Sequence, residues 1–346
     1  MDLALTEEQR QLVESFSGLL ERESSAERVR DAEPTGFDPK LWNMLVEAGV
    51  LHMAVDEDSG GWDASQFELA LVAEQYGRAL GSGPVIEAQV AVALLRDCAA
   101  AGNVAARTAL AAALDGEQLV TFAPRPSATA RLELVPGAAV ADSVLALVGD
   151  QLVIVELADN HTPVRNLGST PLADVDVPTT AVVLAESESG ARLFDRAIDR
   201  WLMFTAAALV GAAARALEIT VDYANQRHAF GKPIGAFQAV SHRLADSATA
   251  IEGARLLAYR AACAEVEEPE RESELAAMAF AFAYESARDV TRRGIHFHGG
   301  YGFMMEQDIQ LFYRRTRGWA NVFGDANVAL DRVAAKRYDS AKSRRQ

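Results

Sequence analysis

Apolar side chains recur at helical spacing through the first third of the chain. Thr6 and Gln9 form a capping box, in which each side chain can satisfy the backbone N–H of the other residue. An apolar series follows at Leu12, Val13, Phe16, Leu19 and Leu20. Further helices are expected at Ser65–Leu80, Glu87–Ala101 and Val104–Leu114. The pattern predicts an N-terminal helical domain over residues 1–117.

The pattern changes between Leu119 and Glu188, where short β-branched or apolar runs alternate with Gly, Pro, Asp and Asn. These runs are Val120–Phe122, Ser143–Val148, Leu152–Val155 and Thr180–Leu184. Residues 118–190 are therefore predicted to form a small, shortened β-domain.

Long helical patterns return after Ala191. They cover Phe194–Gln226, Phe237–Glu267, Glu272–Phe297 and Ala326–Ser343, with a shorter helix near Glu306–Arg317. Four long helices with short links favour an antiparallel four-helix bundle over residues 191–346. The predicted fold class is mainly α with a small β-domain.

Composition and charge narrow the possible partners. The 346 residues carry 33 Lys and Arg against 49 Asp and Glu, a formal net charge of −16, so nucleic acid and anionic membranes are disfavoured. The apolar stretch Trp201–Ala214 is shorter than the roughly 20 residues of a membrane span, and it predicts a buried helix. The start at Met1–Arg10 does not resemble a secretory signal, and Cys98 and Cys263 are too few for a disulfide framework. A cytoplasmic location is expected.

The segment Arg227–Val240 places a cation, an aromatic ring and an amide in one Gly/Pro-rich connection between two helices. Arg227 offers a guanidinium for phosphate, Phe230 a flat apolar face, and Gln238 paired donor and acceptor groups. These groups suit a diphosphate and an adenine. An ordinary solvated loop between helices explains the same spacing.

The segment His296–Phe303 contains the consecutive glycines Gly299 and Gly300 at the end of a long helix. Glycines permit positive φ and a close approach of another group to the backbone, although a plain glycine C-cap has the same pattern. His296 and His298 lack a third metal ligand nearby, so no metal site is predicted. Tyr301 and Trp62 could line a pocket, but packing in the core is favoured for each.

Together these two segments resemble the acyl-CoA dehydrogenase family. The matching residues are Arg227, Phe230–Gly235, Phe237–Val240, His242 and Leu244–Asp246, followed by His298–Phe303 and Glu306. The order of the motifs, their separation and the helix–β–helix layout also agree. The resemblance covers nearly the whole chain.

The resemblance implies FAD bound at a subunit interface and an acyl-CoA that is desaturated between its α and β carbons. Residues matching Arg227, Phe230 and Gln238 contact the ADP portion of a neighbouring subunit's FAD, as does the segment His296–Gly300, which includes Gly299. His296 stands where the family usually has Gln, but it retains hydrogen-bonding capacity.

The catalytic features of the family are missing. The usual catalytic Glu lies in a turn before the last helix, where this chain has Gly324, and the alternative position on an earlier helix is occupied by Trp201. The segment Ala123–Ala128 also replaces the residues with which a subunit holds its own flavin ring. The resemblance therefore points to the base-lacking subunit of actinobacterial heterotetramers, several of which act on sterol side-chain thioesters.

This interpretation implies a homologous partner subunit that carries the catalytic Glu, an acyl-CoA substrate and an electron-transfer flavoprotein as acceptor. One alternative is a self-sufficient homo-oligomer with Asp325 as base, although Asp also suits the N-cap of the last helix. Another is a structural or regulatory homologue that binds no flavin. Arg314, Arg315 and Arg317 are expected to form a basic helix face that pairs with carboxylates.

Overall fold

The computed structural model describes residues 4–158 and 160–339. The chain divides into two compact units, which are described separately. Unit 1 comprises Met1–Glu27, Ala70–Gly81 and Leu202–Gln346, and unit 2 comprises Arg28–Leu69 and Ser82–Trp201. The division into segments 1–117, 118–190 and 191–346 remains a prediction.

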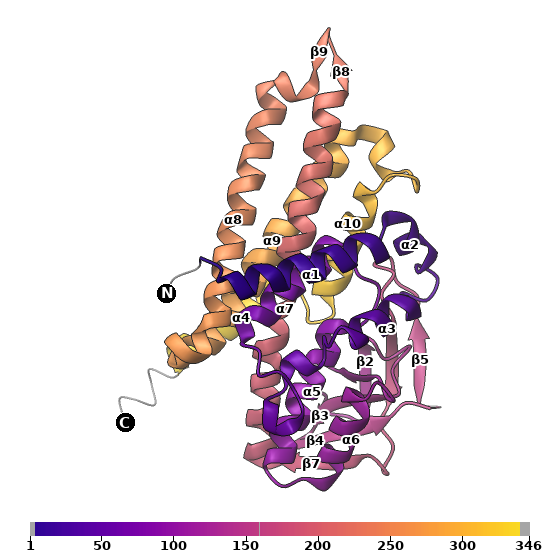
Figure 1. The fold of residues 1–346 in the computed structure, drawn as a ribbon, viewed down its shortest axis with the longest axis vertical. Helices are drawn as coiled ribbons and strands as arrows, with labels where there is room; N and C mark the ends of the chain where they lie inside the picture. Colours follow the sequence, from indigo (N-terminus) through magenta and orange to yellow (C-terminus); the bar gives the residue numbers. More distant parts are fainter. Residues whose placement is uncertain (1–3, 159, 340–346) are drawn as a thin grey trace. The chain divides into compact units, whose positions relative to one another are not determined.

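The helices of unit 1 confirm most of the long helical patterns. Its C-terminal helices are α8 (Gln238–Glu267), α9 (Glu272–His298), α10 (Ile309–Asn321) and α11 (Ala326–Ala334), and it also contains α1 (Glu7–Glu23) and most of α4 (Gln66–Arg78) and α7 (Ser187–Gln226). α9 packs against α8, α10 and α11 (Figure 1). The capping box at Thr6 is present.

The last helix differs from the prediction. α11 ends at Ala334 and a π-helical turn follows over Ala335–Asp339, so the expected helix Ala326–Ser343 is only nine residues long as a regular α-helix. Its predicted last residues, 340–343, lie outside the described residues. Of the four helices predicted to be long, α7, α8 and α9 are long among the described residues, and the fourth is short.

Helices α4 and α7 cross within unit 1 at glycines. A Cβ atom added to Gly77 would lie 1.9 Å from the Ala208 carbonyl oxygen, and one added to Gly211 would lie 1.9 Å from that of Glu74. Side chains at these positions would force the helices apart. α7 is long and apolar enough to cross a membrane, but 72% of its most apolar window is buried inside the protein, as expected for a core helix.

Unit 2 combines helices with two sheets. The helices are α2 (Ala26–Asp31, which begins in unit 1), α3 (Pro39–Glu47), α5 (Val85–Ala100) and α6 (Val104–Leu114). β1 (Val120–Phe122), β3 (Ser143–Val148), β4 (Gln151–Glu156) and β7 (Val182–Glu186) form a sheet in the order β1-β3-β4-β7, and β2 (Arg131–Val135), β6 (Leu172–Asp176) and β5 (His161–Val164) form a second in the order β2-β6-β5. β1 and β3 are parallel, and the other pairs are antiparallel.

A buried carboxyl links α5 to the unit 2 part of α7. The Trp201 indole N–H donates to Glu87 Oε1 at 3.0 Å, and Trp201 is fully buried. Although Glu87 keeps some exposed surface, enclosure of its carboxyl raises its pKa, against the opposing effect of the Trp201 hydrogen bond. The folded state therefore favours the protonated acid.

The raised pKa of Glu87 gives a prediction about stability. A raised folded-state pKa contributes stability below the ordinary value of 4.5, and this is lost as the pH rises through the folded value. Glu87→Gln keeps an acceptor for Trp201 but does not ionise. At pH 8 its free energy of unfolding, measured with denaturant, should therefore exceed that of wild type by about 1 kcal/mol. The difference should vanish at pH 4, and a variant less stable than wild type at both pH values would contradict this account.

Candidate functional site

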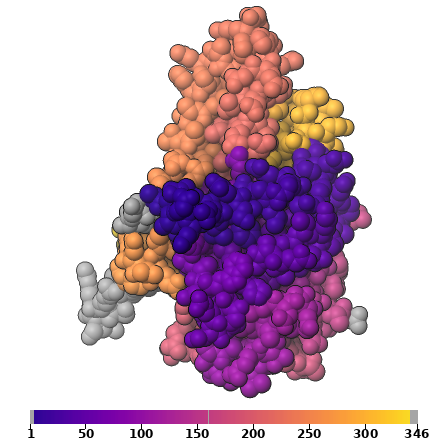
Figure 2. Space-filling model, in the orientation of Figure 1, coloured from indigo at the N-terminus to yellow at the C-terminus, as the bar shows by residue number. Residues whose placement is uncertain are grey.

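The first predicted segment forms a hairpin between α7 and α8. β8 (His228–Ala229) pairs with β9 (Lys232–Pro233), and Phe230 and Gly231 form the turn with φ of 51° and 80°. The hairpin lies at the end of α7 and α8 (Figure 1). On the face shown in Figure 2, no other segment lies over this end of the two helices. Phe230 is 96% exposed. A bulky residue rarely adopts positive φ, so this exposed ring is held in a conformation that costs about 1 kcal/mol.

The second predicted segment forms the end of α9. Gly299 has φ of 64°, and a short 3₁₀ helix, η5, covers Gly299–Phe303. A Cβ atom added to Gly299 or Gly300 would meet no atom within 4 Å. The glycines are therefore not needed for internal packing, and their backbone is open to a group from outside.

Both segments contribute to one pocket of about 630 Å³ within unit 1. The pocket is lined by Tyr223, Gln226, Arg227, Ile234, Phe297, His298, Gly299, Gly300 and Tyr301. The structure thus brings Arg227 together with Gly299 and Gly300. Phe230, Gln238 and His296 are exposed and do not line this pocket, so their predicted roles require a ligand that extends beyond it.

Tyr223 was not among the predicted site residues, and His298 was predicted only as part of the segment His296–Gly300. The Tyr223 ring stacks on the His298 ring, with centroids 4.0 Å apart, and His298 Nδ1 donates to the Gly294 carbonyl at 2.8 Å. Burial lowers the pKa of His298, so the ring is neutral at pH 7 and its Nε2 is an acceptor. Tyr301 is 52% exposed and Trp62 is 53% exposed, so the favoured core placement is wrong for both. Tyr301 instead lines this pocket, which was the alternative for it.

Arg227 is the cation of this pocket. Its backbone is held by hydrogen bonds from Arg227 N to Tyr223 O and from Ile234 N to Arg227 O, both 2.8 Å long. Among the described residues, no side chain or carbonyl pairs with the guanidinium, which is exposed. A guanidinium beside an open glycine backbone and a neutral imidazole suits a phosphate-bearing ligand such as the ADP portion of FAD.

The positions of the family's catalytic bases hold no free carboxylate. Trp201 is buried, and its indole N–H is bound to Glu87. Asp325 caps α11, because its Oδ1 accepts from Asn327 N at 2.9 Å and its Oδ2 accepts from Asn327 Nδ2 at 3.1 Å. Both oxygens of Asp325 are thus engaged in local structure, which favours the N-cap interpretation over a catalytic base.

The backbone at Gly324 also disfavours replacing this residue with a catalytic Glu. It has φ of 127°, and an added Cβ would lie 2.7 Å from Val328 Cγ2. We expect Gly324→Glu to lower the free energy of unfolding by about 1–3 kcal/mol and to leave the lone chain without dehydrogenase activity. Gly324→Ala should lose most of the same free energy of unfolding, as measured with denaturant, because its Cβ atom already causes the clash.

Gly102→Ala is the control for this prediction, because Gly102 has φ of 94° with no atom within 4 Å of an added Cβ. Gly102→Ala should lower the free energy of unfolding by less than Gly324→Ala does. Dehydrogenase activity of the isolated Gly324→Glu chain would contradict the steric argument.

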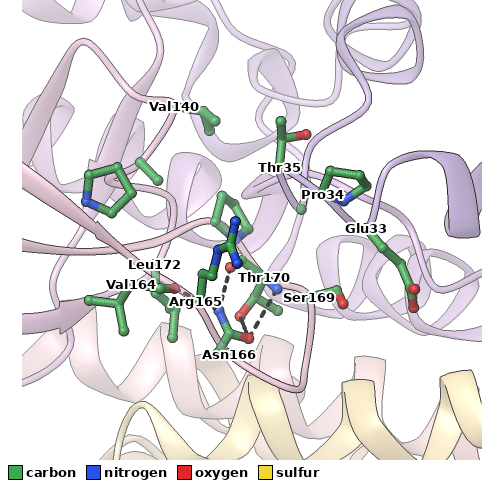
Figure 3. A pocket seen from close by; sticks show the side chains of 14 residues that line it. Glu33, Pro34, Thr35, Val140, Val164, Arg165, Asn166, Ser169, Thr170 and Leu172 are labelled. Atoms are coloured by element: carbon green, nitrogen blue, oxygen red, sulfur yellow. Dashed lines mark hydrogen bonds between the residues drawn. The ribbon is translucent and has the colours of Figure 1, made fainter.

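A second pocket, of about 440 Å³, lies within unit 2 (Figure 3). It is lined by Glu33, Pro34, Thr35, Gly36, Ala139, Val140, Pro163, Val164, Arg165, Asn166, Ser169, Thr170, Pro171 and Leu172. Asn166 Oδ1 accepts from the backbone N and Oγ1 of Thr170, and its Nδ2 donates to Thr170 O at 2.8 Å. Asn166 therefore closes the loop between β5 and β6, and this pocket is not assigned to the cofactor.

No group of three or more His, Cys, Asp or Glu that could hold a metal ion occurs within residues 4–158 and 160–339. His298 lies in the pocket around Arg227 as a neutral ring, and His296 lies on the exposed side of α9.

Comparison with known proteins identifies the family. The model described as acyl-CoA dehydrogenase, N-terminal domain, matches residues 6–114, and that described as acyl-CoA dehydrogenase, C-terminal domain, matches residues 188–337. Acyl-CoA dehydrogenase IpdE2 of Mycolicibacterium smegmatis is 31% identical over 338 residues, which cover 96% of this chain and 99% of the relative. The IpdE2 protein of Mycobacterium tuberculosis is 30% identical over 345 residues, which cover 96% and 98%.

Solved structures share the fold. The ChsE4-ChsE5 complex from Mycobacterium tuberculosis has a TM-score of 0.85 and 24% identity over 97% of this chain and 98% of the other. A steroid ACAD variant, Tcur3481-Tcur3483, has a TM-score of 0.87 and 24% identity over 97% and 99%.

The chain belongs to the acyl-CoA dehydrogenase family. Members of this family are FAD-dependent oxidoreductases that act on acyl-CoAs, and this chain is of that class. Its fold is the mainly helical acyl-CoA dehydrogenase fold with a small β part. The residues around Arg227 fit part of this cofactor, since they provide a free guanidinium and an open glycine backbone in one pocket.

Proposed function

We propose that this chain is the non-catalytic subunit of a mixed acyl-CoA dehydrogenase complex and supplies the ADP-side contacts to FAD. One observation carries the proposal: Arg227, Gly299 and Gly300 line one pocket, while the base positions hold Gly324 and Trp201. A self-sufficient enzyme requires a catalytic base as well as the cofactor contacts.

In this complex Arg227 neutralises the diphosphate, and the backbone of Gly299 and Gly300 allows its close approach. His298 Nε2 offers an acceptor, and Tyr223 keeps that ring in place by stacking. Phe230, Gln238 and His296 extend the contact beyond the pocket, with Phe230 presenting its exposed ring to the adenine side. FAD, when bound, would accept a hydride from the acyl β-carbon.

The partner subunit supplies the carboxylate that removes the α-proton. The ChsE4-ChsE5 complex is a precedent for two different chains of this fold in one assembly, and the name of the steroid ACAD supports a steroid side-chain CoA thioester as substrate. The acceptor proposed for the electrons is an electron-transfer flavoprotein, and the proposed location is the cytoplasm.

Co-purification tests this function. The chain is produced alone and together with a co-encoded acyl-CoA dehydrogenase homologue, and the mass and flavin absorbance per chain are measured. We expect a colourless lone chain and a mixed tetramer with one FAD per two chains. A homo-oligomer with one FAD per chain that is reduced by an acyl-CoA would overturn the proposal.

A further inference from the structure

The pocket of about 440 Å³ in unit 2 has no part in the proposed function. Three segments meet at it, namely residues 33–36 before α3, residues 139–140 before β3 and residues 163–172 from β5 to β6. Figure 3 shows these segments around one space, with Glu33 set apart from Arg165. The volume is within the range of pockets that hold small molecules.

The lining of this pocket is preformed. Three of its residues are prolines, whose rings fix their own φ angles. Gly36 has φ of 70°, and a Cβ atom added to it would lie 2.7 Å from Pro171 N, so the first and third segments are in close contact. Asn166 holds the β5–β6 loop through three hydrogen bonds to Thr170. A lining that is already fixed loses little conformational freedom when a ligand binds, which favours affinity.

The walls of this pocket are largely apolar, because half of the lining residues are Pro, Val, Leu or Ala. Most polar side chains of the lining are used within the chain. Thr35 Oγ1 donates to Phe37 O at 3.1 Å, and Glu33 and Ser169 have interactions of their own in the chain. Arg165 is the exception, and it gives this apolar pocket one available charged group.

The Arg165 guanidinium is exposed and has no hydrogen-bond or ion-pair partner within residues 4–158 and 160–339. Arg317 on α10 also lacks a carboxylate among the described side chains, so the prediction that it pairs with one is wrong. Arg317, however, stacks 3.6 Å from the centroid of the Tyr313 ring and donates to Tyr313 O at 2.9 Å. Arg165 has no such substitute, so its paired N–H donors are free for a carboxylate.

We propose that this pocket binds a small carboxylic acid, as its carboxylate, with a compact apolar body. Arg165 pairs with the carboxylate, and the body lies against the prolines, Val140 and Leu172. A bare anion such as phosphate would leave these apolar walls in water, and a CoA thioester has no carboxylate at its acyl end. The site therefore selects a free acid over both.

This inference goes beyond the proposed function and does not depend on it. The pocket around Arg227 lies in unit 1, whereas the acid pocket consists of residues of unit 2. The two pockets share no residue, so each can be tested without disturbing the other.

Binding of cyclohexylacetate to the full chain, measured by calorimetry, tests the assignment. We expect a dissociation constant of about 1 mM or lower, in keeping with the affinity that so small a ligand can reach. The neutral analogue cyclohexylethanol should bind at least about 10-fold more weakly, because it cannot form the charge-assisted pair. Arg165→Gln should weaken binding of the acid at least about 10-fold and leave binding of the alcohol unchanged.

Arg192→Gln is the matched control, since it removes an exposed guanidinium that does not line this pocket, and it should bind the acid like wild type. Val140→Trp should weaken binding of both the acid and the alcohol, because the indole would fill the apolar part of the pocket. Thermal unfolding of Arg165→Gln should match wild type, because the side chain is exposed and unpaired within the described residues.

Three results would overturn the proposal. The first is an equal affinity of wild type for the acid and the alcohol, and the second is an unchanged affinity for the acid in Arg165→Gln. The third is the absence of saturable binding of the acid up to about 20 mM, which is weaker than any specific site of this kind. Inorganic phosphate that binds as tightly as cyclohexylacetate would identify a plain anion site and overturn the choice of ligand. None of these results bears on the FAD content of the mixed complex.

Discussion

Asp97→Asn is expected to destabilise the protein by about 3–5 kcal/mol, the usual cost of leaving one member of a buried ion pair alone. Asp97 on α5 accepts from Arg200 at 3.0 Å through Oδ2 and from Arg96 at 2.6 Å through Oδ1. The Arg200 side chain is only 4% exposed, and arginine cannot lose its proton. An amide at position 97 therefore leaves a buried charge without compensation.

Guanidinium denaturation of wild type and variant measures this loss. The double variant Asp97→Asn/Arg200→Met should recover most of it, because it removes the buried charge with its partner. Asp222→Asn, at an exposed position on α7, should change stability by less than about 0.5 kcal/mol. A loss in Asp97→Asn no larger than that of the exposed control would contradict the buried-pair account.

The pH dependence has a defined sign. Although burial alone would raise the pKa of Asp97, the Arg200 and Arg96 guanidinium groups hold it below its ordinary value of 3.8. A lowered carboxyl pKa contributes stability that is present above the unfolded value and lost as the pH falls through the folded value. Glu87 has the opposite sign, so acid weakens the Asp97 contribution while it favours protonated Glu87.

The sequence predicted the elements whose signals are local. Val104–Leu114 begins after Asn103, whose side chain accepts from Ala106 N, and the observed bounds agree with the predicted ones. The apolar strands β1 and β3 were also identified correctly. β2, β5 and β6 were missed because polar residues interrupt them, including Glu133 in β2 and Pro163 in β5, and their pairing depends on contacts distant in sequence.

The pocket around Arg227 was also only partly predictable from the sequence. Arg227 and the glycines Gly299 and Gly300 lie in motifs that can be recognised along the chain, and the fold brings them together. The pairing of Tyr223 with His298 depends on how α7 packs beside the end of α9, and no spacing in the sequence contains that information. His296 and His298 are two residues apart on α9, so their side chains point about 200° apart, and only His298 lines the pocket.

Arg227→Ala should weaken FAD retention in the mixed complex by about 10- to 100-fold, the range expected for removing a charge-assisted hydrogen bond of about 1.5–3 kcal/mol. The side chain is exposed and unpaired within the described residues, so its loss should leave the thermal unfolding of this chain unchanged. Flavin fluorescence released on dilution measures the retention.

Arg192→Ala is the matched control for this prediction, because it removes an exposed guanidinium from the other end of α7 and should leave FAD retention at the wild-type level. Arg227→Lys should retain part of the affinity, since an ammonium keeps the charge but not the planar pair of donors. Retention equal to wild type in Arg227→Ala, in a complex of unchanged mass, would remove Arg227 from the cofactor site.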